Sequence, residues 1–161
     1  MKILVVSDTH GHIEPVIAYM NNHPNQFDAM WHLGDHHKDA LRIGHLTGVE
    51  VHGVKGNCDS YSNAEDDLVF KIKGYKVLLT HGHHYGVKYS LLKIHLKAIE
   101  EYCDLVCFGH THIATQLVEN GVTLFNPGSA SQPRTGGYPS VGIIDITESG
   151  IKTSIVPLLS L

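Results

Sequence analysis

Cysteine is scarce in this sequence, and long apolar runs are missing. Three cysteines occur among 161 residues, an odd number and too few for a disulfide framework, and such usage is typical of a reducing compartment. No apolar stretch approaches the roughly 18 residues that a membrane-spanning helix needs. No signal segment opens the chain, because Asp8 and His10 interrupt the first apolar run early. We therefore expect a cytoplasmic protein with no membrane partner.

Long basic runs, repeats and low-complexity segments are also absent. The formal net charge is −4, which disfavours a general nucleic-acid binder. Charged residues make up 17% and hydrophobic residues 42% of the chain, a composition that indicates an ordinary folded protein and excludes a disordered one. Because no linker is visible, the length predicts one domain over residues 1–161.

Histidine, by contrast, is abundant. The chain contains 14 histidines, and none belongs to a hexahistidine run of the kind that an expression tag leaves. Many follow the ends of apolar runs. The first run begins at Lys2, is typical of a buried strand, and ends in Asp8 and His10. These two residues alternate along an extended segment, so both can point at one ion. A carboxylate beside an imidazole suits Mn, Fe, Zn, Co or Ni better than Ca or Mg.

The first half of the chain alternates strand and helix patterns. After the first strand, apolar residues at helical spacing predict a helix over 13–22, and a second, short helix is expected over 38–43. Apolar runs predict strands over 27–33 and 49–55. This β-α-β-α-β order is the signature of a parallel sheet, in which ligand chemistry lies at the carboxyl ends of the strands.

The second half is richer in hairpins. Strand pairs are expected at 67–72 with 76–80, at 115–118 with 122–125, and at 141–146 with 151–156, and a lone strand at 105–108. One strong helix is predicted over 90–102. Its expected apolar face consists of Leu91, Leu92, His95, Leu96 and Ile99. The whole chain therefore predicts a mixed α and β domain.

Ligand-type side chains follow five successive predicted strands. They are Asp8 with His10, Asp35, Asn57, His81, and His110 with His112. Strand ends at one edge of a sheet converge in space, so we expect these side chains to share a pocket. Their two carboxylates, one amide oxygen and four imidazoles exceed the needs of one ion and fit two ions that share a carboxylate. Such a pair of ions clamps a phosphoryl group and lowers the pKa of a bridging water.

Five short blocks of this sequence resemble the calcineurin-like metallophosphoesterases, in type and in order. They are Asp8-Thr9-His10, Gly34-Asp35, Gly56-Asn57-Cys58-Asp59, His81-Gly82-His83 and Gly109-His110-Thr111-His112. With Asn126-Pro127-Gly128-Ser129 they span nearly the whole chain, and the Gly-Asn-Cys-Asp block is similar to that of the small bacterial and archaeal phosphodiesterase subgroup. Each block alone is unspecific, but five in the same order are improbable by chance.

This resemblance implies an α/β (α+β) fold, a four-layer sandwich of two mixed β-sheets flanked by helices, with a dinuclear centre at the strand ends. It gives the first ion the ligands Asp8, His10, Asp35 and His112, and the second ion the ligands Asp35, Asn57, His81 and His110. Asp35 would therefore bridge the two ions. Mn is the metal most often used in such subgroups, and Ni, Fe, Zn and Co are alternatives. The implied reaction is attack of a metal-bridging hydroxide on the phosphorus of a small-molecule phosphodiester.

The sequence departs from the family pattern at Cys58. Larger members such as the protein phosphatases carry a His there, as the inferred general acid. A thiol with a reference pKa of about 8.5 is a poor substitute, so aryl phosphodiesters should be better substrates than alkyl monoesters. The candidate catalytic residues are Asn57, Cys58 and Asp59. Asn57 could touch a phosphate oxygen, and Asp59 could orient Asn57 or an adjacent His.

Two further residues join Asn57 as candidate substrate contacts. His83 flanks the predicted site, and the guanidinium of Arg134 can fork onto oxyanions. For Arg134, a plain surface position is an equally good interpretation. The segment from Asn126 to Ser129 is either a plain turn or a loop that lines the site.

Other functions stay open beside the phosphodiesterase. A eukaryotic retromer subunit is similar to this family in fold but has a degraded metal site, so a non-catalytic scaffold is one alternative; the complete set of ligand positions favours the enzyme. A nuclease is disfavoured by the acidic balance of charge, and a phosphomonoesterase by Cys58. The sequence contains no code for the natural substrate, and it leaves a homodimer and a homotetramer both open.

Overall fold

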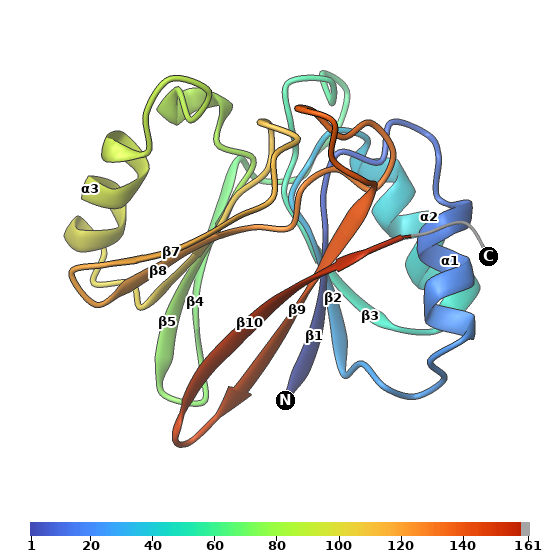
Figure 1. Cartoon of the computed structure of the whole chain (residues 1–161), viewed down its shortest axis with the longest axis horizontal. Helices are drawn as coiled ribbons and strands as arrows, with labels where there is room; N and C mark the ends of the chain where they lie inside the picture. Colours follow the sequence, from blue (N-terminus) through green and yellow to red (C-terminus); the bar gives the residue numbers. More distant parts are fainter. Residues whose placement is uncertain (159–161) are drawn as a thin grey trace.

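The structure is a computed structural model that describes residues 1–158, and it contains two mixed five-stranded sheets (Figure 1). The first sheet has the strand order β10-β9-β1-β2-β3, in which β1, β2 and β3 run parallel, β9 pairs antiparallel with β1, and β10 pairs antiparallel with β9. Its strands are β1 (Lys2–Val6), β2 (Ala29–His32), β3 (Glu50–Gly53), β9 (Ser140–Thr147) and β10 (Gly150–Pro157).

The second sheet has the strand order β4-β5-β6-β8-β7. Its three central strands are parallel, and an antiparallel strand closes each edge. The strands are β4 (Asp67–Ile72), β5 (Tyr75–Thr80), β6 (Leu105–Cys107), β7 (Thr115–Glu119) and β8 (Val122–Asn126).

Helices cover the outer face of each sheet, which gives four layers (Figure 1). Helices α1 (Glu14–Asn21) and α2 (His37–Thr47) lie against the first sheet, and α3 (Leu92–Glu100) lies against the second. A short 3₁₀ turn, η1 (His83–Tyr85), precedes α3. The predicted four-layer sandwich is therefore confirmed. The predicted domain ran to Leu161, and its last three residues lie outside the described range.

The apolar run of β1 is explained by burial on both of its faces. Ile3 and Val5 belong to the core between the two sheets, whereas Leu4 and Val6 belong to the core beneath α1 and α2. A strand that is covered on both faces has no polar face to present, so its sequence is continuously apolar. Its carboxyl end delivers the following loop to the end of the sandwich where the loops after the other parallel strands also lie (Figure 1).

Two of the predicted elements differ from the structure. Helix α2 was predicted to end at Ile43 but continues to Thr47, where Gly48 adopts a left-handed φ of 73° and ends it. The apolar face predicted for α3 is largely wrong. Leu92, Leu96 and Ile99 are exposed, because α3 packs on the sheet through a neighbouring stripe that contains Ile94, His95 and Ala98. Within residues 1–158, no helix is long and apolar enough to span a membrane.

Candidate metal centre

Loops that follow five parallel strands carry the predicted ligands to one place. Asp8 and His10 follow β1, Asp35 follows β2, Asn57 follows β3, His81 follows β5, and His110 and His112 follow β6. The contacts link all seven side chains into one continuous group, in which Asp35 touches both halves. The convergence that the strand ends predicted is therefore present.

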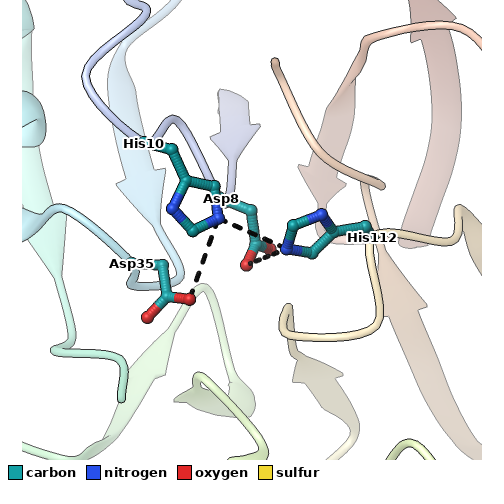
Figure 2. A group of neighbouring side chains, drawn as sticks. All are labelled: Asp8, His10, Asp35 and His112. Atoms are coloured by element: carbon teal, nitrogen blue, oxygen red, sulfur yellow. Dashed lines mark hydrogen bonds and ion pairs between the residues drawn. The ribbon is translucent and has the colours of Figure 1, made fainter. Parts of the chain in front are cut away.

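The first half of the group consists of Asp8, His10, Asp35 and His112 (Figure 2). His112 Nε2 lies 3.1 Å from Asp8 Oδ1 and 3.3 Å from His10 Nε2. His10 Nε2 lies 3.9 Å from Asp35 Oδ2. Ligand atoms of all four residues lie within 4.8 Å of one another, which is close enough for one metal ion. Two carboxylates and two imidazoles suit a divalent transition metal.

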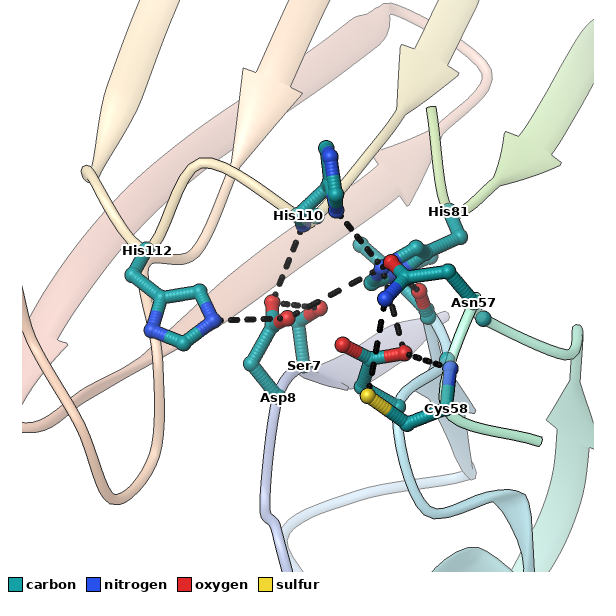
Figure 3. A network of polar contacts seen from close by, with 12 residues as sticks. Ser7, Asp8, Asn57, Cys58, His81, His110 and His112 are labelled. Atoms are coloured by element: carbon teal, nitrogen blue, oxygen red, sulfur yellow. Dashed lines mark hydrogen bonds and ion pairs between the residues drawn. The ribbon is translucent and has the colours of Figure 1, made fainter. Parts of the chain in front are cut away.

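The second half is built on Asp35, His81 and His110, which also meet the spacing for a metal ion. His81 Nε2 is its centre, at 3.4 Å from Asp35 Oδ1 and 3.2 Å from His110 Nδ1. The amide oxygen of Asn57 adds a possible fourth ligand atom at 3.1 Å from His81 Nε2 (Figure 3). Asp35 directs one oxygen to each half, which is the arrangement expected of a bridging carboxylate.

Backbone carbonyls fix the orientation of two of the imidazoles. His81 Nδ1 lies 2.7 Å from the carbonyl oxygen of Leu33, and His112 Nδ1 lies 2.6 Å from that of Gln132. Since a carbonyl can only accept, each Nδ1 carries the proton and donates it. Each Nε2 therefore turns toward the centre, as in metal-binding histidines. Asp8 raises the pKa of His112, and at His81 burial is outweighed by Asp35 and Asp8, which raise its pKa, so a bound cation would take the place of the Nε2 proton.

The two carboxylates are held in their ionised form. Burial alone raises the pKa of Asp8, but His112, His81 and the Ser7 hydroxyl outweigh it, and the net pKa is lowered. Burial also raises the pKa of Asp35, but His81 and the N–H of Cys58, 2.9 Å from Asp35 Oδ1, outweigh it and the net pKa falls well below its usual range. Burial lowers the pKa of His110 to about 4. At neutral pH these groups present charged oxygens and an unprotonated ring, which is what a cation requires.

Strained backbone concentrates at the same residues. Asp8, His10, Asp35, His110 and His112 all have φ between 46° and 66°, in the left-handed region that non-glycine residues seldom adopt. Gly109 packs so closely that an added Cβ would run into the Ser7 hydroxyl and the Asp8 carboxylate. Such strain is retained where the surrounding structure requires the side chains to point in one direction.

The residues present fit a metal ion. Asp8 Oδ1 is buried and has no hydrogen-bond partner among the described residues, although the His112 ring stands close to it. A buried carboxylate oxygen without a partner is costly. A cation between Asp8 and the facing imidazole nitrogens would satisfy this oxygen, and the mixed carboxylate and imidazole set suits a divalent ion.

The comparisons with known proteins agree with this geometry. A family model described as the calcineurin-like phosphoesterase superfamily domain matches residues 1–149. The chain belongs to this superfamily. It is 36% identical over 146 residues to the probable metallophosphoesterase YsnB of Bacillus subtilis, with 91% of this chain and 85% of YsnB covered. It is 28% identical to the phosphodiesterase YfcE of Escherichia coli, with 90% and 88% covered. The family implies divalent metal ions, and the two clusters are candidate sites for them.

Solved structures share the fold of this superfamily member. A conserved protein from Streptococcus pneumoniae, described as a predicted phosphoesterase, aligns with a TM-score of 0.83 at 28% identity, covering 98% of this chain and 89% of that one. A Vps29 variant from Entamoeba histolytica aligns with a TM-score of 0.79 at 24% identity, covering 98% and 99%. The second likeness is one of fold alone.

The Gly-Asn-Cys-Asp block of this superfamily member lies beside the metal centre. The Cys58 side chain is exposed, and its Sγ lies 3.5 Å from Asn57 Nδ2. Burial and the nearby Asp35 raise the pKa of Cys58 to about 11. The Asp59 carboxylate accepts three backbone N–H bonds, from Gly56 at 2.8 Å, from His36 at 3.1 Å and from His37 at 2.8 Å. Asp59 thus joins the block to the loop that carries Asp35, and its described bonds do not include the Asn57 side chain.

The two other predicted substrate contacts flank different halves of the candidate metal centre. The ring centroid of His83 is 5.3 Å from that of His81 and 6.0 Å from that of His110, so His83 flanks the second cluster. Arg134 is exposed, and its backbone N–H donates to the carbonyl of His112 at 3.1 Å. Arg134 is therefore near the first cluster.

The Asn126-Pro127-Gly128-Ser129 segment forms hydrogen bonds to the loops that carry the predicted ligands. Asn126 Nδ2 donates to the carbonyl of Gly109 and to Thr111 Oγ1, each at 3.0 Å. Ser129 Oγ donates to the carbonyl of Asp8 at 2.8 Å. Both side chains are fully buried. The segment ties the loop after β6 to the loop after β1, so it is more than a plain turn, and it acts on the ligands through their backbone.

A second support was missed by sequence reasoning. His32 is fully buried on β2; its Nδ1 accepts the N–H of Gly34 at 3.3 Å, and its Nε2 lies 3.2 Å from Thr9 Oγ1. Thr9 donates to Asp39 Oδ2 at 2.7 Å, and the same oxygen accepts the N–H of Gly11. This network fixes the loop that bears Asp8 and His10. Only Thr9, which separates two ligands, carries a sequence signal for it.

Proposed function

We propose that this protein is a phosphodiesterase that hydrolyses small-molecule phosphodiesters at a dinuclear metal centre. The observation that carries the proposal is the convergence of seven ligand-type side chains on two adjacent positions that share Asp35. Membership of the superfamily supports phosphoester hydrolysis, and the similarity to a protein named a phosphodiesterase supports the diester preference.

In this proposal, the ligands divide between two ions in the way that the family resemblance implies. Asp8, His10, Asp35 and His112 would hold the first ion, and Asp35, Asn57, His81 and His110 the second. When bound, such ions act as Lewis acids on a phosphoryl oxygen and lower the pKa of a bound water. Mn is the proposed metal, and Ni, Fe, Zn and Co are compatible with the same mixture of imidazole and carboxylate ligands.

The block at residues 56–59 supplies the polypeptide's own contribution to the reaction. Asn57 has an exposed side chain whose amide can turn an N–H toward a phosphoryl oxygen. Cys58, with its pKa raised to about 11, stays protonated at neutral pH but is a weak acid. A weak proton donor limits the departure of alkoxides far more than that of phenolates. Aryl diesters are therefore the expected good substrates, and alkyl monoesters the poor ones.

Metal removal and reconstitution test the proposal. The protein is stripped with a chelator, reloaded with Mn²⁺, and assayed with bis(4-nitrophenyl) phosphate beside 4-nitrophenyl phosphate. We expect no turnover in the stripped protein, recovery with Mn²⁺, and faster cleavage of the diester. Full activity in the stripped protein would contradict the metal mechanism, and a preference for the monoester would contradict the assignment of diesters as substrates.

A non-catalytic scaffold of the same fold is the alternative. The likeness to a Vps29 structure favours it at the level of fold. The complete ligand set speaks against it, because a scaffold has no need of two carboxylates and four imidazoles that point at one place. Elemental analysis decides between them: a protein that takes up no metal after incubation with Mn²⁺ would support the scaffold and contradict the enzyme.

A further inference from the structure

A cleft of about 890 Å³ opens directly beside the candidate metal centre. The start of α2, the end of β3 and the loop over residues 58–64 form its walls. None of the predicted metal ligands lines it, Asn57 included, and neither do His83 and Arg134, the two other side chains predicted to contact substrate. The cleft is thus a separate feature with its own lining chemistry.

The cleft adjoins the metal centre through two of its lining residues. They are Cys58 and His36, and each is joined to a predicted ligand. The N–H of Cys58 donates to Asp35 Oδ1 at 2.9 Å, and the His36 ring centroid lies 5.4 Å from that of His10. A phosphoryl group bound at the two ion positions therefore has one of its ester groups within reach of the cleft.

The walls offer apolar and aromatic surface together with polar groups, among them the cationic side chain of Lys38. The Tyr61 side chain is fully exposed, and Leu41, which is 60% exposed, lies on α2. Val51 and Leu68 add further apolar lining. The one carboxylate in the lining belongs to Asp59, and it already accepts three backbone N–H bonds. Exposed aromatic and aliphatic side chains that face a cleft are surface for a flat apolar group.

The wall that carries Tyr61 is held in place before any ligand binds. The N–H of Ser62 donates to the carbonyl of Asp59 at 2.9 Å. Ser62 Oγ accepts the N–H of Ala64 at 3.1 Å and lies 3.2 Å from His37 Nδ1 on α2. Together with the bonds to Asp59, these contacts attach the loop to the helix opposite. The backbone of this loop is therefore preformed, which lowers the ordering cost of binding, and the exposed Tyr61 side chain is the part left to be ordered.

We propose that this cleft binds an aromatic ring carried by one ester group of the substrate, with Tyr61 and Leu41 as the residues that select it. The inference rests on the proposed function, since it needs a phosphoryl group at the metal centre. It narrows the substrate class to phosphodiesters with an aryl or a nucleobase-bearing group. Both groups present a flat aromatic ring, and they are distinguished by experiment.

Binding of two phosphonates to the Mn²⁺-loaded protein tests the inference without turnover. Isothermal titration calorimetry compares phenylphosphonate with methylphosphonate, which share the anionic group and differ in the ring. We expect phenylphosphonate to bind about tenfold more tightly, as the contact of one aromatic ring with a preformed wall provides. Thymidine 5′-monophosphate is the third ligand: binding tighter than that of phenylphosphonate assigns a nucleoside, and weaker binding assigns a simple aryl group.

Two pairs of variants test which residues cause the preference for phenylphosphonate over methylphosphonate. Tyr61→Ala should remove most of the preference for the ring, whereas Tyr89→Ala, an equally exposed tyrosine outside the cleft, should leave it unchanged. Leu41→Ala should reduce the preference about threefold, and Leu46→Ala is its control, because Leu46 lies on the same helix, is 55% exposed and does not line the cleft. All four side chains are exposed, so the fold should tolerate the changes. Methylphosphonate should bind all variants alike.

The outcomes separate this inference from the proposed function. Equal affinity for the two phosphonates, or a ring preference that survives Tyr61→Ala and Leu41→Ala together, would overturn the inference and leave the metal centre intact. A ring preference that depends on Tyr61 in a protein without hydrolytic activity would uphold the cleft and overturn the enzyme. If neither phosphonate binds, the cleft proposal falls together with the proposed centre.

Discussion

The two halves of the metal centre differ in charge and in exposure. The first has Asp8 for itself and a share of Asp35, and its Asp8 carboxylate is fully buried. The second has only the share of Asp35, and its remaining oxygen ligand is the neutral amide of Asn57, on an exposed residue. Since affinity for a cation rises with the charge of the ligands, the first position should hold its ion more tightly. The second should exchange its ion more readily and lie nearer to the substrate.

Asp35→Asn should have the largest effect, because it removes the one carboxylate that both halves share. We expect the second ion to be lost, the first to be weakened, and hydrolysis of bis(4-nitrophenyl) phosphate to fall about 10⁴-fold or more. Metal content per chain and initial rates are the measurements.

Asp145→Asn is the matched control for that variant. Asp145 is half-exposed and, among residues 1–158, forms its one ion pair with Lys2, at 3.8 Å, so metal content and rate should stay as in the native protein. Circular dichroism establishes that both variants are folded. A folded Asp35→Asn protein that keeps two ions per chain would refute the shared carboxylate.

His81→Ala and His112→Ala compare the two halves directly, since each removes one imidazole whose orientation a backbone carbonyl fixes. Both should lower the rate, by about 10³-fold at low Mn²⁺ concentration. The more charged first position still has two carboxylates in His112→Ala, so excess Mn²⁺ should restore much more of its activity. Titration of the rate with Mn²⁺ measures this, and equal rescue of the two variants would show that the halves are equivalent.

Asn57→Asp should make the two halves alike by giving the second position a carboxylate of its own. We expect the second ion to survive dialysis that removes it from the native protein. The rate should nevertheless fall, by about 10²-fold, because the amide N–H proposed to face the phosphoryl oxygen is gone. Tighter metal binding with a slower reaction is a combination that misfolding would not produce. Loss of metal from this variant would contradict the charge argument.

Cys58→Ser should have the smallest effect. The contact of Cys58 with Asp35 uses its backbone N–H, which serine keeps. The rate with bis(4-nitrophenyl) phosphate, whose leaving group needs no proton, should change within about threefold. A drop of a hundredfold with this substrate would show that the thiol does more than donate a proton to the leaving group, which would contradict this account.

The metal ligands were predictable because each stands in a short, recognisable stretch of the sequence. An apolar run ends, a glycine stands near, and a ligand-type residue follows; Asp35, His81 and His110 each show this pattern. Parallel strands then bring the ends together without further information. The sandwich followed from the same order of elements and from the family resemblance. Its layers are confirmed by the three separate apolar cores, one between the sheets and one beneath each set of helices.

Features that depend on distant contacts were not predictable. Helix α3 carries apolar side chains on more than one stripe, and periodicity alone could not tell that Ile94 and Ala98 face the sheet while Leu92 and Leu96 face outward. The network around His32 joins residues of the loop after β1, of β2 and of α2 that no motif connects. The cleft was not predictable either. Leu41 and Tyr61 both line it, and they come from segments that show no common pattern in the sequence.

The central claim is that two unequal positions share the carboxylate of Asp35, and electron paramagnetic resonance during a Mn²⁺ titration tests it most directly. The account predicts an isolated six-line Mn²⁺ signal at the first equivalent, when the first position fills. Near the second equivalent this signal should give way to the spectrum of an exchange-coupled pair, because ions bridged by one carboxylate lie about 3.5–4 Å apart. In Asp35→Asn the coupled spectrum should never form. An uncoupled signal that simply doubles at the second equivalent would contradict the account.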